Sequence, residues 1–409
     1  MINIFKNLII FSSLLSFILS GDIRLGIDVF ENEYIQLIRD KRIALLINHT
    51  SLNSEGKHIV DIVSENNLNL VKIFAPEHGY LGDRPAGQKI KNNVDPITGC
   101  EVVSLYGKNK APTNSSMADI DVLIFDIQDI GVRYYTYIST LTLAMEKAAE
   151  HNVDFIVLDR PNPLSGEIQG SLLDEGYSSF VGMHPIPVRH GMTVGEIALL
   201  VKQNKWIRNS EDLKLKIIKI KDWDRSSLFD RYNKLWTPPS PNIPDFKTAL
   251  IYVGLCLLEG TNVSEGRGTP SPFKLFGSPW LNSEKLILAL NQYNFNGVVF
   301  SAEEFIPVDI KGKAMNPKYE DVLCHGVRIK VIDKNAINPF SIASAIIYEI
   351  HRLHPDKFEF KDDFFDKLYG SSDLRLAILE SRNIDELMEN NEKDIEVFKK
   401  LREKALLYK

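Results

Sequence analysis

Two short motifs carry the residue types that acid–base chemistry needs, and the first is APEHG. It places Glu77 and His78 directly before Gly79, at the end of an apolar run. A carboxylate that is partly removed from water has its pKa raised toward neutral pH, so this pair suits proton transfer. The glycine allows the chain to turn sharply. On these residues alone, Glu77 could equally be a cap of the following turn.

The second motif is EGTNVSEGRGTPSPF, residues 259–273. It holds Glu259, Asn262, Glu265 and Arg267 among three glycines and two prolines. Such a backbone cannot form a helix, and so many ionisable groups beside an apolar run exceed what a linker requires. We therefore predict ligand-binding or catalytic residues in this segment, with a solvated surface loop as the alternative.

A third segment, FDIQDIGVRYYTYIS, combines carboxylates and an amide with aromatic rings. Its polar residues are Asp126, Gln128, Asp129 and Arg133, and tyrosines follow at 134, 135 and 137. Carboxylates and amides hydrogen-bond sugar hydroxyls, while aromatic rings cover the apolar faces of a pyranose. The alternative is that the tyrosines begin a helix and pack on a sheet, and we expect at least one of them to be a core residue.

Arginines recur in segments of this kind. Four of them stand in predicted loops, namely Arg133, Arg160, Arg189 and Arg267. An arginine fork binds a carboxylate through two parallel hydrogen bonds, so a substrate that bears a carboxylate is a reasonable expectation. Each arginine alone is more often a structural ion-pair partner.

The sequence lacks the motifs that are typical of several other enzyme classes. The sequence has no GxGxxG, GxxxxGK[ST], GxSxG or HExxH pattern, so nothing indicates a dinucleotide, a nucleoside triphosphate, a serine hydrolase or a zincin. The histidines are irregularly spaced, and neither a metal nor a cofactor is expected. Forty-eight Lys and Arg against 54 Asp and Glu give a net charge of -6, which argues against a nucleic-acid partner.

Strands and helices alternate in the first part of the chain. Apolar runs predict strands at 42–47, 70–75, 121–126 and 154–159, and helical periodicity covers 53–67 and 138–150. Strands that hardly alternate in polarity are buried on both faces, as in a parallel sheet. We predict an α/β fold, with a Rossmann-like, doubly wound and mostly parallel sheet. Polar residues such as Asn48, Glu77, Gln128 and Arg160 follow these strands, at the edge where parallel sheets bind ligands.

The remainder of the chain suggests a second domain, as a length of 409 residues also does. Thr193 is placed to cap a helix, and 215–220 reads as a strand. Four prolines within 237–245 predict a stiff, extended crossing between domains. The apolar run 251–258 is predicted as a strand, followed by an α+β tail. The predicted domains are 22–245 and a smaller α+β domain, 246–409.

The first twenty residues have the layout of a secretory signal. Lys6 precedes about a dozen mostly apolar residues, too few to span a bilayer comfortably, and Ser20 and Gly21 follow. We expect an exported protein, periplasmic or extracellular, with no stable membrane insertion once residues 1–20 are cleaved. An uncleaved membrane anchor is the alternative.

Six segments, in order along the chain, closely resemble the exo-β-N-acetylmuramidases: FAPEHGYLGDRPAG, DVLIFDIQDIGVRYYTYISTL, VLDRPNP, PIPVRHGMTVGE, PPSPNIP and CLLEGTNVSEGRGT. These bacterial glycosidases remove terminal N-acetylmuramic acid from the non-reducing end of peptidoglycan fragments. The resemblance runs from about Gly26 to the C-terminus. It implies a Rossmann-like N-terminal domain, a smaller C-terminal domain and an active-site cleft between them.

The resemblance also makes Glu77 and Glu265 the leading catalytic candidates. We expect twelve further residues to shape the substrate pocket: Asn48, His78, Asp126, Gln128, Arg133, Tyr135, Arg160, His190, Asn242, Glu259, Asn262 and Arg267. The chain departs from the family pattern beside the first motif, where Ala75 replaces a commoner glycine and Tyr80-Leu81 replace a commoner Phe-Arg.

Several mechanisms and functions remain open at the level of sequence. Glycoside cleavage commonly uses one carboxylic acid on the leaving oxygen and a second carboxylate as base or nucleophile. The 2-acetamido group of the sugar could also attack the anomeric carbon. A non-catalytic muropeptide-binding protein, or a metal-dependent deacetylase or amidase acting on the same polymer, are the alternative functions.

Overall fold

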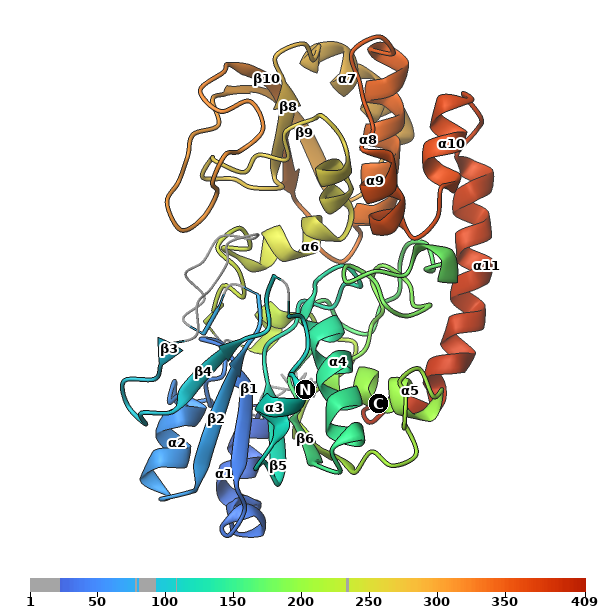
Figure 1. Cartoon of the computed structure of the whole chain (residues 1–409). Coiled ribbons are helices and arrows are strands. Elements are labelled where there is room, and N and C mark those ends of the chain that lie inside the picture. Colours follow the sequence, from blue (N-terminus) through green and yellow to red (C-terminus); the bar gives the residue numbers. More distant parts are fainter. Residues whose placement is uncertain (1–22, 78, 81–92, 108, 233–234) are drawn as a thin grey trace, which may run out of the picture.

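The protein consists of two domains stacked one above the other (Figure 1). The computed structural model describes residues 23–77, 79–80, 93–107, 109–232 and 235–409. The predicted signal segment and His78 lie outside the described residues. In the part that the structure describes, no helix is both long enough and apolar enough to cross a membrane.

The N-terminal domain is built on a sheet that, in the described residues, has seven strands in the order β3-β4-β2-β1-β5-β6-β7. All neighbouring strands are parallel except the short edge strand β3 and β4. The strands are β1 (Ile43–Ile47), β2 (Leu70–Ala75), β3 (Asn93–Val94), β4 (Glu101–Ser104), β5 (Val122–Asp126), β6 (Asp154–Leu158) and β7 (Leu215–Ile218). The chain winds outward from β1 in one direction and restarts beside β1 at β5. The predicted doubly wound α/β fold is therefore confirmed.

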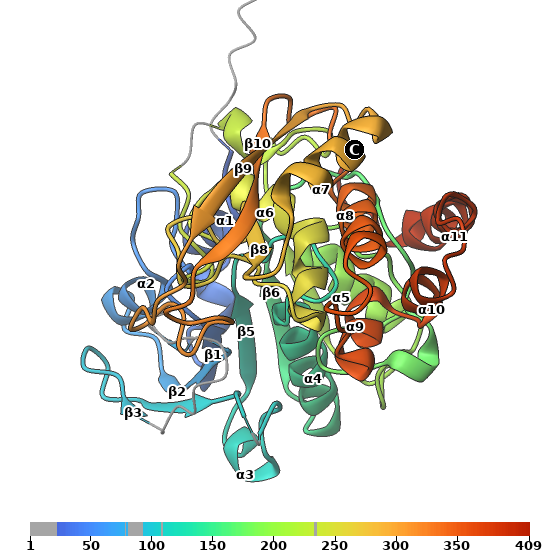
Figure 2. The same ribbon diagram turned by 90° about the horizontal axis from the view of Figure 1, so that it is seen from above.

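Helices cover both faces of this sheet (Figure 2). Successive residues of each strand point to opposite faces, so apolar side chains on both faces need a covering layer. In β1, Ile43, Leu45 and Ile47 pack with two helices on one face, and Ala44 and Leu46 pack with the helices of the other face. The first pair is α1 (Gly26–Glu33) and α2 (Ile59–Glu65), and the second is α4 (Tyr137–Glu150) and α5 (Val194–Gln203). A short helix, α3 (Asn114–Met117), precedes β5.

Two predicted elements were wrong. The helix predicted at 53–67 begins only at Ile59, because the Asn53 side chain accepts hydrogen bonds from the backbone of Glu55 and Lys57 and closes a turn instead. The strand predicted at 251–258 is helical, as α6 (Phe246–Leu255) and a following 3₁₀ turn. Asp245 caps this helix through the Thr248 N–H, and burial on all sides gives the helix the continuous apolar run that also marks a buried strand.

The C-terminal domain contains, in the described residues, a three-stranded antiparallel sheet in the order β8-β10-β9. Its strands are β8 (Leu275–Ser278), β9 (Val298–Phe305) and β10 (Cys324–Val331). Its helices are α7 (Ser283–Leu290), α8 (Pro339–Leu353), α9 (Asp362–Tyr369) and α10 (Asp373–Leu379). The core is shared with the N-terminal domain, because α6 and α8 belong to the same apolar cluster as the α4 face of the large sheet.

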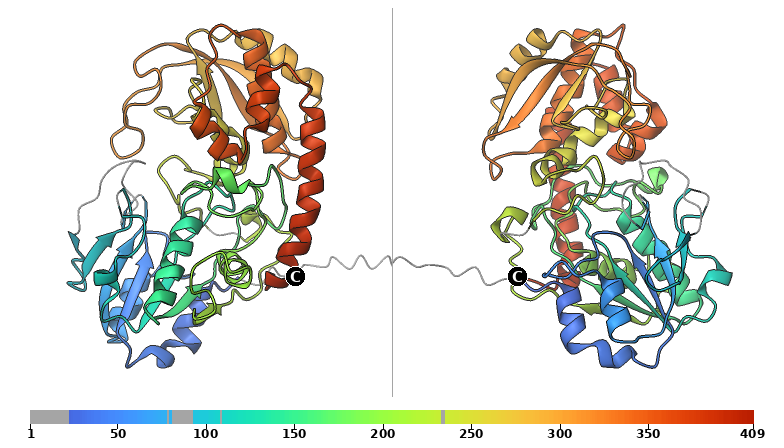
Figure 3. Two further views of the ribbon diagram at one scale, coloured as in Figure 1. Left: turned by 45° about the vertical axis from the view of Figure 1, so that its right-hand side comes forward. Right: turned by 90° about the vertical axis from the view of Figure 1, so that its left-hand side faces the viewer.

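The last helix, α11 (Asp385–Arg402), leaves the upper domain and runs down the side of the lower one (Figure 3). At its end, Arg402 donates hydrogen bonds to the carbonyls of Gly166 and Gly191, at 3.0 and 2.9 Å. Six residues later, the Tyr408 hydroxyl donates to Asp159 Oδ2 at 2.6 Å. The C-terminal residues are thereby fixed to the N-terminal domain.

Arg133 joins the two domains from the inside. Its guanidinium is fully buried and donates to the carbonyls of Ser171 and Ile186 and, across the domain boundary, to those of Leu368 and Tyr369, at 2.6–2.9 Å. Burial lowers the pKa of Arg133 to about 10, so the side chain still carries its charge at pH 7. Arg133 is thus a structural residue, because its two terminal nitrogens are committed to backbone oxygens.

We expect Arg133→Met to lower the free energy of unfolding by about 3 kcal/mol or more, because four buried carbonyl oxygens each lose a charged donor. Urea unfolding followed by circular dichroism measures this loss. Arg231→Met is the control, since Arg231 forms an exposed pair with Asp224 that should contribute less than about 1 kcal/mol. Equal losses in the two variants would contradict a role of Arg133 in joining the domains.

Candidate active site

The predicted catalytic residue Glu77 lines a cavity between the two domains, which we name the Glu77 cavity. Its volume is about 220 Å³. The residues that line it come from both domains: Glu77, Tyr134, Tyr135, Thr136, Tyr137, Val181, Ser240, Ile243, Tyr252, Cys256, Glu259, Arg267, Phe273, Phe364 and Leu368. A cleft between the domains was predicted, and two carboxylates, Glu77 and Glu259, meet there from opposite domains.

Glu77 is positioned by the end of β2 and the start of α4. The chain turns after Pro76, where the Gly79 N–H donates to the Pro76 carbonyl at 3.0 Å and Gly79 adopts a positive φ of 75°. The Thr136 hydroxyl donates to Glu77 Oε2 at 2.8 Å. Thr136 is the N-cap residue of α4, and the N-terminal end of a helix favours a nearby negative charge. One oxygen of the Glu77 carboxylate is therefore fixed on the side of the cavity that the N-terminal domain forms.

The tyrosines of the third motif form an aromatic wall of the Glu77 cavity. All three are buried, as expected for at least one of them. Tyr134 crosses the domain boundary and donates its hydroxyl hydrogen bond to the Tyr252 carbonyl at 3.0 Å, while Tyr137 donates to Pro239 at 2.8 Å and accepts from Asn48 at 3.0 Å. The ring of Tyr135 packs edge-on between those of Tyr137 and Tyr252. These hydrogen bonds give the wall a fixed shape.

A second cavity of about 310 Å³ adjoins the first, and we name it the lysine cavity. It is lined by Glu259, Glu265, Arg267, Lys313, Ala314, Met315, Asn316, Pro317, Lys318, Lys361 and Phe364. Three of these residues, Glu259, Arg267 and Phe364, also line the Glu77 cavity. The two cavities are therefore neighbours that share a wall, with Glu77 in one and Glu265 in the other.

The glycine-rich loop 259–273 holds its charged residues by tight backbone packing. Gly266 and Gly268 adopt positive φ angles of 78° and 81°, and a Cβ on Gly266 would lie 2.2 Å from the Leu275 carbonyl oxygen. The N–H of Phe273 donates to the Glu265 carbonyl at 2.7 Å and closes the loop. The glycines are thus required by the backbone, and the loop turns Glu265 inward.

Ion pairs link the carboxylates of this loop. Arg267 Nη2 lies 2.6 Å from Glu259 Oε1, and Arg267 Nε lies 3.4 Å from Glu265 Oε1. The Lys318 ammonium lies 2.9 Å from Glu265 Oε2. Burial by itself would raise the pKa of Glu265, but Lys318 and Arg267 outweigh it and hold that pKa below its ordinary value. Glu265 is consequently an ionised carboxylate at neutral pH.

Three predicted pocket residues form an internal network at the carboxyl ends of β1, β5 and β6. Arg160 binds Asp126 through Nε at 2.5 Å and Nη2 at 2.9 Å, and both residues are buried. Asn48 is fully buried and accepts hydrogen bonds from the Thr50 N–H and hydroxyl. Asp126 and Asn48 support the sheet edge, and neither side chain lines the Glu77 cavity or the lysine cavity.

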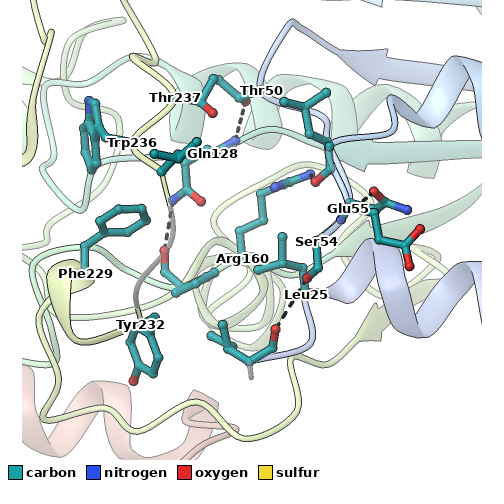
Figure 4. A pocket seen from close by; sticks show the side chains of 16 residues that line it. Leu25, Thr50, Ser54, Glu55, Gln128, Arg160, Phe229, Tyr232, Trp236 and Thr237 are labelled. Carbon is teal, nitrogen blue, oxygen red and sulfur yellow. Dashed lines mark hydrogen bonds between the residues drawn. The ribbon is translucent and has the colours of Figure 1, made fainter. Parts of the chain in front are cut away.

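Arg160 and Gln128 instead line a third cavity of about 470 Å³, at the point where the strand order reverses. Figure 4 shows the rings of Phe229, Tyr232 and Trp236 on one side of it and Arg160 toward the other. Glu55 is the one carboxylate among its described lining residues. Paired carboxylates, which glycoside chemistry uses, occur in the Glu77 and lysine cavities rather than in this larger one.

Four further predicted pocket residues do not line any of these three cavities. A fifth, His78, lies outside the described residues. Arg133 fills the domain interface, and His190 is fully buried, where burial and the nearby Arg402 lower its pKa to about 3. Asn242 donates to the Lys313 carbonyl at 2.8 Å, and Asn262 pairs with the backbone of Lys357 and Glu359. In this structure each of these four side chains joins segments of the protein, and their contact with substrate stays a prediction.

Sequence reasoning missed the lysines of the lysine cavity. Lys313, Lys318 and Lys361 come from two surface segments far along the chain from the glycine-rich loop, and no motif surrounds them. Only the tertiary structure brings them to Glu265. Over the described residues, which omit His78, no group of at least three His, Cys, Asp or Glu side chains is arranged to hold a metal ion.

Comparison with known proteins gives matches over nearly the whole chain. Residues 43–247 match the family model described as exo-β-N-acetylmuramidase NamZ, N-terminal, and residues 250–408 match the C-terminal model of the same name. The chain is 40% identical over 389 residues to the peptidoglycan β-N-acetylmuramidase NamZ of Bacillus subtilis (strain 168). That alignment covers 94% of this chain and 91% of the relative.

Two solved structures share the fold of this chain. Two DUF1343 family proteins from Bacteroides fragilis NCTC 9343 have crystal structures that superpose with TM-scores of 0.85 and 0.78, at 34% and 35% sequence identity. Each comparison covers 95% of this chain and 99% of the other. The chain belongs to the NamZ family of exo-β-N-acetylmuramidases.

Proposed function

We propose that this protein is an exo-acting glycosidase that releases terminal N-acetylmuramic acid from the non-reducing end of peptidoglycan fragments. One observation carries the proposal: Glu77, Glu259 and Glu265, contributed by both domains, converge on two adjoining cavities in a member of this family. Hydrolysis of a glycosidic bond commonly uses two carboxyl groups that flank the bond, one of them as a proton donor.

Glu77 is the proton donor in this proposal. The Glu265 carboxylate is held ionised by Lys318 and Arg267, so it cannot supply a proton at neutral pH. Glu77 has no cation within ion-pair distance among the described residues, and its one described hydrogen bond comes from the neutral Thr136 hydroxyl. Glu77 lines the cavity and is therefore the carboxyl group placed to protonate the leaving oxygen.

Glu265 serves as the partner carboxylate. Positive charge develops on the sugar ring in the oxocarbenium-like transition state, and a fixed negative charge stabilises it. Because Arg267 is paired with both Glu259 and Glu265, the three side chains keep one arrangement as the substrate enters. Such preorganisation avoids moving charges at the moment of reaction.

The size of the Glu77 cavity supports action at a chain end. Its volume of about 220 Å³ is below the roughly 300–1,000 Å³ of common small-molecule sites, which suits one sugar residue rather than a stretch of polymer.

We also propose that the protein is exported, as the apolar leader at residues 1–20 suggests. Its polymeric substrate lies outside the cytoplasmic membrane.

The first test concerns the catalytic carboxylates. We expect Glu77→Gln to lower kcat for release of N-acetylmuramic acid from a chromogenic muramoyl glycoside by about 10²- to 10⁴-fold, the usual contribution of a general acid. Glu265→Gln should also be strongly impaired, whereas the control Glu55→Gln, in the third cavity, should retain full activity. Near-normal turnover by both Glu77→Gln and Glu265→Gln would remove the assignment.

The same assay separates the alternative functions. Calorimetric binding of muropeptides by the wild-type protein without any release of sugar would indicate a binding protein. Loss of activity with a chelator, restored by a divalent metal, would indicate a metal-dependent enzyme. The glycosidase should turn over at an unchanged rate in the presence of EDTA, because its chemistry uses carboxyl groups alone.

A second test uses the pH dependence of the reaction. Lys318 lowers the pKa of Glu265, so removing its charge in Lys318→Met should raise that pKa and move the acid limb of the kcat/KM profile to higher pH. Lys330→Met, at an exposed position on β10, is the control and should leave the profile in place. An acid limb at the wild-type position in Lys318→Met would contradict the role of Glu265 as an ionised partner.

A further inference from the structure

The lysine cavity carries more positive than negative charge. Its described lining residues include two carboxylates and four cations. The carboxylates are matched by Arg267 with Glu259 and by Lys318 with Glu265, at 2.6 and 2.9 Å. Lys313 and Lys361 form no ion pair or side-chain hydrogen bond with any residue whose position is described. The cavity therefore has a surplus of two ammonium groups, although the protein as a whole is acidic, with a net charge of -6.

The backbone holds both lysines at the cavity. Lys361 immediately precedes α9, and its N–H donates to the Gly260 carbonyl at 2.8 Å, which fixes it beside the glycine-rich loop. The carbonyl of Lys313 accepts a hydrogen bond from Asn242 at 2.8 Å. Burial and the neighbouring Lys318 lower the pKa of Lys361, while Glu265 and Glu259 act in the opposite direction. Lys361 thus lies within the electric field of the paired charges.

Three of the loop arginines that the sequence suggested as carboxylate ligands are occupied elsewhere. Arg133 donates to four backbone carbonyls, Arg160 is bound to Asp126, and Arg189 pairs with Glu167 and the Leu164 carbonyl. All three are buried, and none of them lines the Glu77 cavity or the lysine cavity. Among the described residues that line the lysine cavity, Lys313 and Lys361 are consequently the cations available to an entering carboxylate.

We infer that Lys361 and Lys313 bind the lactyl carboxylate of the terminal N-acetylmuramic acid and so select this sugar over neutral N-acetylglucosamine. The inference rests on the proposed function and names the residues that set its specificity. The lactyl ether is what distinguishes the two sugars, and it adds one negative charge. An ammonium group that is solvent-accessible before binding forms a charge-assisted hydrogen bond to such a group.

The arrangement of the two cavities fits this division of tasks. The proton donor Glu77 lies in one cavity and the surplus positive charge in the other, with Phe364 in the shared wall. A terminal sugar in the Glu77 cavity has its glycosidic oxygen at Glu77, and its lactyl arm extends past the Phe364 ring toward the lysines. The lysines contact the substrate at a point remote from the bond that breaks.

The test compares a chromogenic β-N-acetylmuraminide with the methyl ester of its lactyl group, which is neutral, on Lys361→Gln, Lys313→Gln and the double variant. We expect the KM for the free acid to rise about tenfold or more per lysine, with kinetics on the ester unchanged. Added salt should weaken binding of the acid by the wild type and less so by the double variant. Lys330→Gln is the control for a lost surface charge, since Lys330 lies at the far end of β10 from the loop that carries Lys313.

Each outcome decides a separate point. A double variant that keeps the wild-type preference for the acid over the ester overturns the inference, provided that its thermal unfolding is unchanged. An effect of the substitutions that appears only with peptide-bearing fragments also overturns it, because the recognised carboxylate would then belong to the peptide. A wild-type protein that cleaves neither glycoside refutes the proposed function itself.

Discussion

Pairing of the buried Glu265 carboxylate constrains the rest of the site. The residue is only 4% exposed, and an ionised carboxylate removed from water costs several kcal/mol unless opposite charges surround it. Lys318 and Arg267 supply those charges, and Lys318 also donates to the carbonyls of Leu258 and Val263. The glycine-rich loop, the end of α6 and the surface loop with Lys318 must therefore pack against one another before the charges are satisfied.

The large sheet supplies the opposing half of the site. A doubly wound sheet gathers the loops after its strands at one edge, and Glu77 follows β2 at that edge, beside the N-cap residue Thr136 of α4. The glycine-rich loop follows α6, which packs in one continuous core with the α4 face of the sheet. The same apolar burial that stabilises both domains thus sets the distance between their carboxylates.

The sheet and the two loops that carry Glu77 and Glu265 could be predicted from the sequence, because each leaves a local pattern. Strands buried on both faces leave uniform apolar runs, and a glycine-rich loop dense in charge stands out locally. The same uniform run misled the prediction at α6, where a helix buried on all sides looks identical. The backbone partners of Arg133 were not foreseen, because charge in a loop does not reveal whether its partner is a ligand or a backbone carbonyl. Lys361 had no local signal, since only tertiary contacts bring it near Glu265.

The several ties between the domains bear on how the site can work. Arg133 and Tyr134 donate hydrogen bonds across the interface from within, and Arg402 and Tyr408 secure the C-terminal residues from outside. With the interface fixed in this way, the free-energy cost of aligning Glu77 with the C-terminal carboxylates is met during folding rather than at each turnover.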